Sequence, residues 1–545
     1  MEKTLTINQL VSKAQDALSA KNHEFACALA QQIAQLRPRD AHVIKIAGWI
    51  YLKAGRHRTA VSYFEKALEL SPSHVDAIHG KAVALSRLGP ARAAEVCFSA
   101  ALKQAPENRA LIRDYVSHLT HVSQRFALAA TLMTELYEKD PKNLDYIETL
   151  GFLLERSNQL QELENLLGRV SAAHIESPNI TLLTAKLAFR RSDFEQADSA
   201  LRSLPESELR LESRAVASEL RAKIAEHKSR YTEAYNHYLA ANRHNFSSYM
   251  RHATGVGDFN LYAEEIHARL SDPSFNWSEL AAARSSVSEG SDPIFLIGFP
   301  RSGTTMLESI FRTDDALTIL EERNTILDMK NSVTGEPFLQ NDVTFSPSLV
   351  RDSRAAYWEA VHSYLESEHT GPIIDKMPLW IAQMPIIATI FPSAKFVVAL
   401  RTPADAILSA FQQNFRLNTA MLSLTSIGRA IHLYDKVFGI YDMVNTRLSP
   451  EVLEVRYEDI VQDWDNQIVR IFGFLGRRVP EGVKNFHQRA RSRDVRTTSY
   501  AQVSEPLNSR SIGKWKNYRD IFEPYSGILD KWCHRFGYDA CSSNN

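Results

Sequence analysis

The stretch that decides the fold of the C-terminal half is Ile294-Phe-Leu-Ile-Gly-Phe-Pro-Arg-Ser-Gly-Thr-Thr305. Its first four residues are all apolar, as in a strand that is buried inside a parallel sheet. The residues that follow, Met306 to Phe311, have a helical pattern. A strand, a glycine turn and a helix in this order direct backbone N–H groups and a helix N-terminus at an anion. The stretch therefore predicts a phosphate-binding loop in an α/β domain.

The loop has the glycine spacing of a Walker loop but lacks its lysine. Gly298 and Gly303 are correctly spaced, whereas Thr304 stands where a nucleotide hydrolase needs lysine. Arg301 supplies the cation inside the loop instead. A loop without the lysine is poorly suited to a Mg-bound triphosphate, which disfavours a nucleotide kinase and favours a different phosphate ligand.

The segment Pro300-Arg-Ser-Gly-Thr-Thr305 resembles the 5′-phosphosulfate loop of sulfotransferases, which bind the donor 3′-phosphoadenylyl sulfate (PAPS). A second apolar run, Lys395–Leu400, is followed by Arg401 and, eight residues later, by Ser409. The family's 3′-phosphate element likewise has an arginine at a strand end and a serine at that spacing. Two helical turns return the hydroxyl to the face beneath the arginine, so that both can bind one phosphate.

Two further segments extend the resemblance. Tyr457-Glu-Asp459 resembles the family segment whose tyrosine lies against the adenine. Gln502 to Trp515 reproduces the donor-covering loop of tyrosylprotein sulfotransferases, Gln-Val-x-x-Pro-x-Asn with Lys-Trp beyond it. Residues 491–519 carry seven Lys or Arg and two acids, which favours a polyanionic ligand. The resemblance implies these donor-binding residues: Arg301, Ser302, Gly303, Thr304, Thr305, Arg401, Ser409, Tyr457, Ser499, Gln502, Asn508 and Lys514.

Sulfuryl transfer also needs a base that removes a proton from the acceptor hydroxyl. By the resemblance this base is Glu322, which lies 21 residues after Arg301, with the neighbouring Glu321 as the alternative. The tyrosylprotein sulfotransferases have Thr-Arg directly after the two glutamates. Arg323-Asn324 stands there in this chain. The acceptor contact that the family's arginine makes is therefore not predicted here.

The remaining catalytic groups stabilise charge and orient the donor. The run Ile373-Ile-Asp-Lys376 predicts a third strand, and Lys376 at its end matches the family's lysine at the leaving oxygen. Ser499 matches the serine that hydrogen-bonds the transferring group, and Arg301 supports the 5′ side. Arginines, lysine and loop amides neutralise the donor in this arrangement, so we expect no metal ion.

The first half of the chain repeats with a period of 34 residues. Pro38, Pro72 and Pro106 keep this spacing, and small and large residues recur between them. The pattern resembles the tetratricopeptide repeat, in which two antiparallel helices form each unit and a proline closes the second helix. Such units stack into a superhelix with a concave surface. We therefore expect the repeats to bind a protein or peptide partner, or to form a homodimer.

The expected domain organisation has three parts. About seven tetratricopeptide units occupy residues 1–244, a helical connector and linker follow over 245–291, and the sulfotransferase domain covers 292–540. The fold class is multidomain: an all-α superhelix followed by an α/β domain of phosphate-loop type with a parallel sheet.

Composition limits the remaining possibilities. The 545 residues are 44% hydrophobic, and 63 Lys and Arg balance 64 Asp and Glu, so the overall charge favours neither nucleic acid nor an anionic membrane. Four cysteines without metal-type spacing form no disulfide framework. The sequence has no apolar stretch long enough to span a bilayer, and its first residues have no long apolar run, so we expect no secretory signal. We therefore expect a cytoplasmic protein.

Taken together, these patterns predict a PAPS-dependent sulfotransferase, of bacterial type, whose acceptor is a protein or peptide tyrosine. Two alternatives stay open. The acceptor could be a carbohydrate or a small molecule, because those sulfotransferases share both phosphate elements. The chain could also be a non-catalytic repeat scaffold that carries a nucleotide-binding module.

Overall fold

The structure is a computed structural model of the chain, and it describes residues 6–89, 91–171, 176–253, 257–286, 292–333, 346–365, 371–491 and 507–542. The chain divides into two compact units, Met1–Leu183 and Thr184–Asn545. Helix α11 (Pro178–Arg190) contains the point of division. The domain boundaries expected at 244 and 291 remain predictions.

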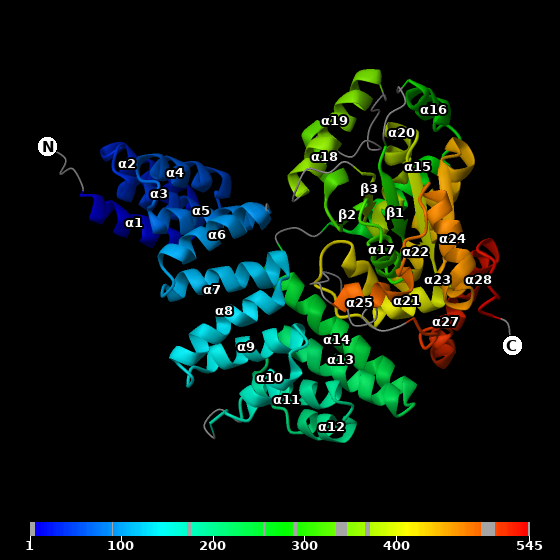
Figure 1. Cartoon of the computed structure of the whole chain (residues 1–545), viewed down its shortest axis with the longest axis horizontal. Helices are drawn as coiled ribbons and strands as arrows, with labels where there is room; N and C mark the ends of the chain where they lie inside the picture. Colours follow the sequence, from blue (N-terminus) through cyan, green and yellow to red (C-terminus); the bar gives the residue numbers. More distant parts are fainter. Residues whose placement is uncertain are drawn as a thin grey trace. The chain divides into compact units, whose positions relative to one another are not determined.

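The first unit consists of paired helices, which confirms the predicted tetratricopeptide architecture (Figure 1). The packing of α3 (Ala41–Lys53), α4 (His57–Leu70) and α5 (Val75–Leu88) explains the repeating small residues. The ring of Phe64 fills the space between Gly48 and Gly80, where an added Cβ would lie 2.8 Å and 2.3 Å from it. The other helices of this unit are α1 (Ile7–Ser19), α2 (His23–Leu36), α6 (Ala91–Gln104), α7 (Arg109–His118), α8 (Phe126–Lys139), α9 (Leu144–Arg156) and α10 (Leu160–Leu167).

The second unit begins with helices that share a core with the α/β domain. Ala222 and Ala225 of α13 (Leu211–His227) and Tyr238 of α14 (Tyr231–His252) belong to the same buried cluster as the sheet residue Phe295. The last predicted repeat helices therefore pack as part of the second unit. The other helices of this unit are α12 (Phe194–Arg202), α15 (Phe259–Ser271), α16 (Trp277–Ser285), α17 (Thr304–Phe311), α18 (Thr325–Val333), α19 (Pro347–Tyr364), α20 (Met384–Ile390), α21 (Pro403–Phe411), α22 (Ile427–Leu448), α23 (Tyr457–Gln462), α24 (Trp464–Phe474), α25 (Phe486–Arg491), α27 (Arg519–Phe522) and α28 (Ser526–Arg535).

The α/β domain contains one five-stranded sheet with the order β2-β3-β1-β4-β5. All neighbouring strands are parallel, as the sequence predicts. Since the strands run in one direction, their carboxyl ends meet at one edge of the sheet, where ligands bind in open α/β folds. The strands are β1 (Ile294–Gly298), β2 (Thr318–Glu321), β3 (Ile373–Lys376), β4 (Lys395–Leu400) and β5 (Glu451–Arg456).

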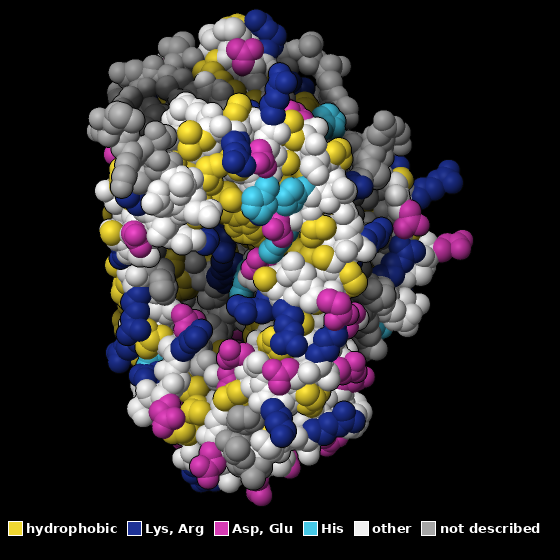
Figure 2. Space-filling model, turned by 90° about the vertical axis from the view of Figure 1, so that its left-hand side faces the viewer, with side chains coloured by type: hydrophobic (Ala, Val, Ile, Leu, Met, Phe, Trp, Pro, Cys, Tyr) yellow, Lys and Arg dark blue, Asp and Glu magenta, His cyan; other side chains and the backbone are white. Residues whose placement is uncertain are grey.

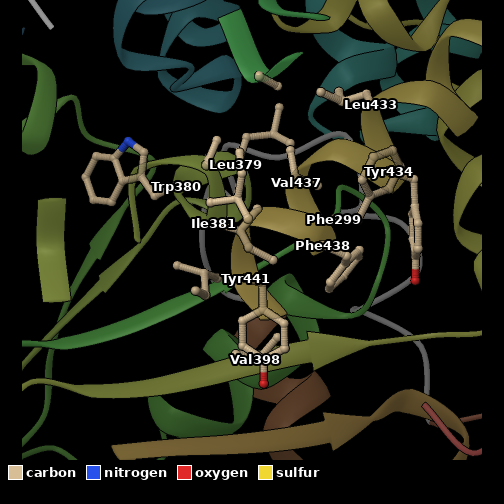
Figure 3. Close-up of a cluster of buried hydrophobic side chains, with 14 of the residues drawn as sticks. Phe299, Leu379, Trp380, Ile381, Val398, Leu433, Tyr434, Val437, Phe438 and Tyr441 are labelled. Carbon is tan, nitrogen blue, oxygen red and sulfur yellow. The ribbon is translucent and has the colours of Figure 1, made fainter. Parts of the chain in front are cut away.

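Helices cover both faces of the sheet, so that the domain has three layers (Figure 1). Phe295 and Ile297 point to the layer that contains α20 and α22, whereas Leu296 points to α17 and α24. This alternation explains why β1 is apolar at every position. Figure 3 shows part of the core that contains Phe295. There Phe299, the first residue after β1, lies among side chains of α22 that include Tyr434 and Phe438. The ring centroids of Phe299 and Tyr434 are 5.0 Å apart.

The surface reflects the balanced composition. On the face shown in Figure 2, Lys and Arg side chains are interspersed with Asp and Glu side chains. None of the helices in the described ranges is both long enough and apolar enough to cross a membrane.

Candidate functional site

The phosphate loop connects β1 to α17 at the carboxyl edge of the sheet. An added Cβ on Gly298 would lie 2.5 Å from the carbonyl oxygen of Ala399, so only glycine lets β1 pass this close to β4. Arg301 and Gly303 both have a left-handed backbone, with φ of 69° and 100°. The chain thus makes a tight turn before α17 begins at Thr304. This is the geometry in which loop amides and a helix N-terminus converge on an anion.

The two predicted phosphate elements meet in the structure. Arg301 Nε donates a hydrogen bond to Ser409 Oγ at 3.1 Å, and Arg401 Nη1 donates to the carbonyl oxygen of Arg301 at 3.2 Å. Burial, and then the nearby charge of Arg401, lowers the pKa of Arg301 to about 10. Two buried guanidinium groups held side by side disfavour each other, and an anionic ligand would relieve this repulsion.

Two buried polar atoms at this place lack a partner within the part of the chain that the structure describes. They are Ser302 Oγ in the loop and Arg401 Nε at the end of β4. A buried donor without a partner is unfavourable by about 1–3 kcal/mol, more when it is charged. Both atoms can donate to phosphate oxygens, so the residues present fit the phosphate groups of PAPS.

Tyr457 connects β5 to the segment that begins at residue 507. Its hydroxyl lies 3.2 Å from the carbonyl oxygen of Asn508 and 3.2 Å from Ser511 Oγ. The guanidinium of Arg401 lies 5.4 Å from the centroid of the Tyr457 ring, within the range of a cation–π contact. The structure therefore brings the predicted residues Tyr457, Arg401 and Asn508 together.

Asp405, which the sequence analysis did not identify, fixes the next part of this segment. Its two carboxylate oxygens accept hydrogen bonds from the backbone amides of Gly513 at 2.6 Å and Trp515 at 2.9 Å. Asp405 lies in the first turn of α21, the helix that also carries Ser409. The Lys514-Trp515 pair is thereby tied to the helix of the second phosphate element.

Lys514 itself is paired with a carboxylate. Its Nζ lies 2.9 Å from Glu226 Oε1 of α13 and 3.0 Å from Gln412 Oε1. Tyr518 also donates to Glu226 Oε1, at 2.5 Å. No local pattern predicts the contact with Glu226, because it joins the last predicted repeat to a segment 288 residues later in the chain. The donor-binding role of Lys514 stays a prediction.

Glu322 and Lys376, the predicted base and the predicted lysine, meet at the carboxyl ends of β2 and β3. The two strands pair in register, with Glu321 opposite Lys376. Glu322 follows β2 with a left-handed backbone, and its amide donates to the carbonyl oxygen of Lys376 at 2.8 Å. Glu322 Oε1 lies 2.8 Å from Lys376 Nζ. The structure therefore forms an ion pair from the predicted base and the predicted lysine.

Glu308 is a third member of this group that the sequence analysis missed. Its Oε2 lies 3.2 Å from Lys376 Nζ, and its Oε1 accepts a hydrogen bond from Arg312 Nε at 2.8 Å. Burial favours the neutral carboxyl, but the charges of Lys376 and Arg312 outweigh it and lower the pKa of Glu308. The available signal was a single acid inside the otherwise apolar helix from Met306 to Phe311.

The two candidate bases differ in accessibility. Glu321 is buried, and its Oε2 lies 4.0 Å from Arg312 Nη2. Burial, followed by the charge of Glu308, raises the pKa of Glu321. The side chain of Glu322 is 41% exposed. An acceptor can therefore reach Glu322 directly.

Two predicted residues, Ser499 and Gln502, lie outside the described residues. Across the described ranges, no three or more His, Cys, Asp or Glu side chains are grouped so that they could hold a metal ion.

Comparisons with known proteins agree with this architecture. Residues 293–481 match the model of the sulfotransferase family, and residues 51–114 match that of the tetratricopeptide repeat. Protein-tyrosine sulfotransferase 1 of Danio rerio is 24% identical over 266 residues, which cover 45% of this chain and 72% of the relative. Nodulation protein NoeE of Sinorhizobium fredii is 24% identical over 259 residues, covering 42% of this chain and 61% of the relative.

A longer match is to an uncharacterized protein of Aquifex aeolicus. It is 23% identical over 425 residues, which cover 74% of this chain and 52% of the relative. The chain thus spans about half the length of that relative. The chain is therefore similar to tetratricopeptide repeats over residues 51–114 and to the sulfotransferase family over residues 293–481, where the structure has paired helices and a parallel sheet respectively.

Proposed function

We propose that this protein transfers a sulfuryl group from PAPS to an acceptor hydroxyl. The observation that carries the proposal is the arrangement at the carboxyl edge of the sheet. The phosphate elements around Arg301 and Arg401 occupy the ends of β1 and β4, and the Glu322–Lys376 pair occupies the ends of β2 and β3. β1 pairs with both β3 and β4, so the two groups lie on adjacent strands.

PAPS supplies the reactive sulfuryl group, and the protein binds and orients it. Loop residues 301–305 and the N-terminus of α17 bind the 5′ side, and Arg401 with Ser409 binds the 3′-phosphate. The proposal is supported by two buried hydrogen-bond donors, Ser302 Oγ and Arg401 Nε, which have no partner among the described residues. Charge-assisted bonds from arginine to phosphate are the strongest that the protein can offer here. Tyr457, Ser499, Gln502, Asn508 and Lys514 complete the proposed donor site.

The acceptor side depends on Glu322 and Lys376. Glu322, whose side chain is 41% exposed, accepts the proton of the acceptor hydroxyl. Lys376 stays protonated because the carboxylates around it, Glu322 first and Glu308 next, outweigh burial and raise its pKa. An ammonium held at the end of β3 can stabilise negative charge on a leaving oxygen.

We propose a tyrosine of a protein or peptide as the acceptor. A phenol with a pKa of about 10 needs a nearby base at neutral pH, and Glu322 can supply one. The pattern from Gln502 to Trp515 and the similarity to a relative named protein-tyrosine sulfotransferase 1 support this choice. The tetratricopeptide repeats support a polypeptide partner, since stacked repeats expose an extended concave surface.

The test is transfer from PAPS that carries labelled sulfate into a cell lysate, followed by mass spectrometry of the labelled species. We expect label on protein tyrosine. Label only on glycans or small metabolites would replace the tyrosine acceptor while leaving sulfuryl transfer in place. No transfer to any fraction, together with unaltered binding of adenosine 3′,5′-bisphosphate, would instead support a nucleotide-binding scaffold.

A further inference from the structure

Lys376 is fully buried between two carboxylates that differ in exposure. Its side chain has 0% exposure, and its Nζ lies 2.8 Å from Glu322 Oε1 and 3.2 Å from Glu308 Oε2. Glu322 is 41% exposed, whereas Glu308 is 3% exposed. One partner of the lysine therefore faces solvent and the other is enclosed by protein.

The exposed partner cannot neutralise Lys376 throughout the reaction. As the base, Glu322 takes up the proton of the acceptor hydroxyl and becomes a neutral carboxylic acid. A buried ammonium without a counter-charge is unfavourable by several kcal/mol, and burial then drives it to lose its proton. Lys376 must keep its proton to stabilise charge at the leaving oxygen. It therefore needs a second, permanent counter-ion. Glu321, the third carboxyl that acts on Lys376, is less suited to this role, because burial and the charge of Glu308 raise its pKa.

Glu308 has the geometry of such a counter-ion. Arg312, one helical turn later on the same helix segment, binds Glu308 Oε1 at 2.8 Å and leaves Oε2 directed at Lys376. The positive charges of Lys376 and Arg312 keep Glu308 ionised in spite of its burial. α17 also begins at the phosphate loop, so the counter-ion and the loop belong to one rigid element.

We propose that Glu308 is a positioning residue. It keeps Lys376 protonated and fixed in place while Glu322 takes up the proton of the acceptor hydroxyl and later releases it. This inference rests on the proposed sulfuryl transfer. Glu308 acts through Lys376, because its side chain is enclosed by protein. The set of groups that determine activity thus extends from the ends of β2 and β3 into the first helix after the phosphate loop.

The first experiment measures how strongly Glu308 and Lys376 are coupled in the stability of the fold, without any catalytic assay. Urea denaturation is compared for the wild type, Glu308→Gln, Lys376→Met and the double variant. We expect Glu308→Gln to lower the unfolding midpoint, because it leaves a buried ammonium poorly neutralised. The double variant should lose less than the sum of the two single variants. Strictly additive losses would overturn the role of Glu308 as counter-ion.

The second experiment measures kcat, KM and their pH dependence for sulfuryl transfer. Glu308→Gln should lower kcat by roughly 10- to 100-fold with little change in the KM for PAPS. Its kcat should also decline above about pH 8, where the wild type does not, because Lys376 now loses its proton more easily. Glu308→Asp, which keeps the charge, should restore the wild-type pH profile. A lower kcat with an unchanged profile in Glu308→Gln would contradict the proposal.

A matched control separates this effect from general loss of stability. Glu155 of α9, in the first compact unit, is also buried, and Glu155→Gln should keep the wild-type pH profile whatever stability it loses. If wild-type protein transfers no sulfuryl group, the proposed function fails, and the denaturation experiment still decides whether Glu308 is the counter-ion of Lys376. If Glu308→Gln does not fold, a double variant with Lys376→Met that does fold would support the pairing, and a double variant that also fails to fold would contradict it.

Discussion

Arg301 Nε and Ser409 Oγ lie 3.1 Å apart although 108 residues separate them in the chain. The bond joins the loop after β1 to the helix after β4, so the two phosphate elements form one site. Arg401, at the end of β4, binds the carbonyl oxygen of Arg301 and completes the contact. The two elements, which are separate in the sequence, are thus adjacent in the fold, as the proposed binding of one nucleotide requires.

Replacing Arg401 should weaken binding of adenosine 3′,5′-bisphosphate. Arg401→Ala removes a charge-assisted contact, which is worth about 1.5–3 kcal/mol, or roughly 10- to 150-fold in Kd. Isothermal titration calorimetry checks this value. Binding of adenosine 5′-monophosphate, which lacks the 3′-phosphate, should change much less. Equal losses for both nucleotides would mean that Arg401 does not bind the 3′-phosphate.

Replacing Gly298 should destabilise the second unit. A Cβ at this position would lie 2.5 Å from the backbone oxygen of Ala399, and the φ of 149° is unfavourable for any side chain. The clashing atom belongs to the backbone of Ala399 and cannot move aside as a flexible side chain would. We therefore expect Gly298→Ala to lower the free energy of unfolding by about 2–4 kcal/mol. Chemical denaturation measures the loss.

The control for this prediction is Gly527→Ala in α28. Apart from its chain neighbours and the backbone of its own helix, no atom of the described residues lies within 4 Å of the added Cβ there, and alanine favours a helix. Its stability should stay equal or rise by up to about 1 kcal/mol. A loss as large as that of Gly298→Ala would show that any glycine replacement destabilises this unit.

In the first unit, Gly80→Ala should disturb the packing of two repeats. The new Cβ would lie 2.3 Å from the ring of Phe64, and overpacking of this kind costs about 1–3 kcal/mol. Thermal unfolding followed by circular dichroism measures the effect. In a Phe64→Leu background, where the ring is gone, the added loss should shrink. An undiminished loss would contradict the steric explanation.

Asp375 should make stability depend on pH. Burial raises the pKa of this carboxyl from 3.8 to about 7, although hydrogen bonds from Thr325 and Tyr357 act in the opposite direction. Between about pH 4 and pH 7 the folded state therefore binds more protons than the unfolded state. The contribution of Asp375 to the free energy of unfolding therefore falls as the pH rises, by at most about 1.4 kcal/mol per pH unit.

The variant Asp375→Asn tests this sign, because it cannot ionise. The free energy of unfolding of the variant, minus that of the wild type, should increase steadily from pH 4 to pH 7. Urea denaturation at several pH values provides the difference and cancels the contributions of other carboxylates. A difference that stays constant, or decreases, would contradict the raised pKa of Asp375.

Local sequence patterns predicted much of this architecture. The apolar runs at 294–297, 373–376 and 395–400 became strands, and the glycine turn after Ile297 became the phosphate loop. These features depend on burial and on backbone geometry within a few residues, which a local pattern records. The 34-residue period was visible because each repeat must leave room for the same large side chain.

The contacts between distant segments could not be predicted in this way. Strand β2 is only four residues long, and the two glutamates at its end, Glu321 and the following Glu322, also fit a helix start, so its pairing with β3 left no local sign. The ion pairs of Glu308 and Glu226 could not be predicted for the same reason. Their partners, Lys376 and Lys514, lie on segments that only the tertiary fold brings near. Such contacts depend on the fold as a whole.

Release of adenosine 3′,5′-bisphosphate from PAPS in the presence of an acceptor tests the proposed sulfuryl transfer most directly. The decisive measurement compares wild-type protein with Glu322→Gln, which keeps the shape of the side chain but cannot accept the proton. We predict stoichiometric formation of the bisphosphate and of a sulfated product by the wild type. The variant should bind the bisphosphate normally and lose transfer by roughly 100- to 10,000-fold. Equal transfer rates for both proteins, or no transfer by the wild type with any acceptor fraction, would contradict the account.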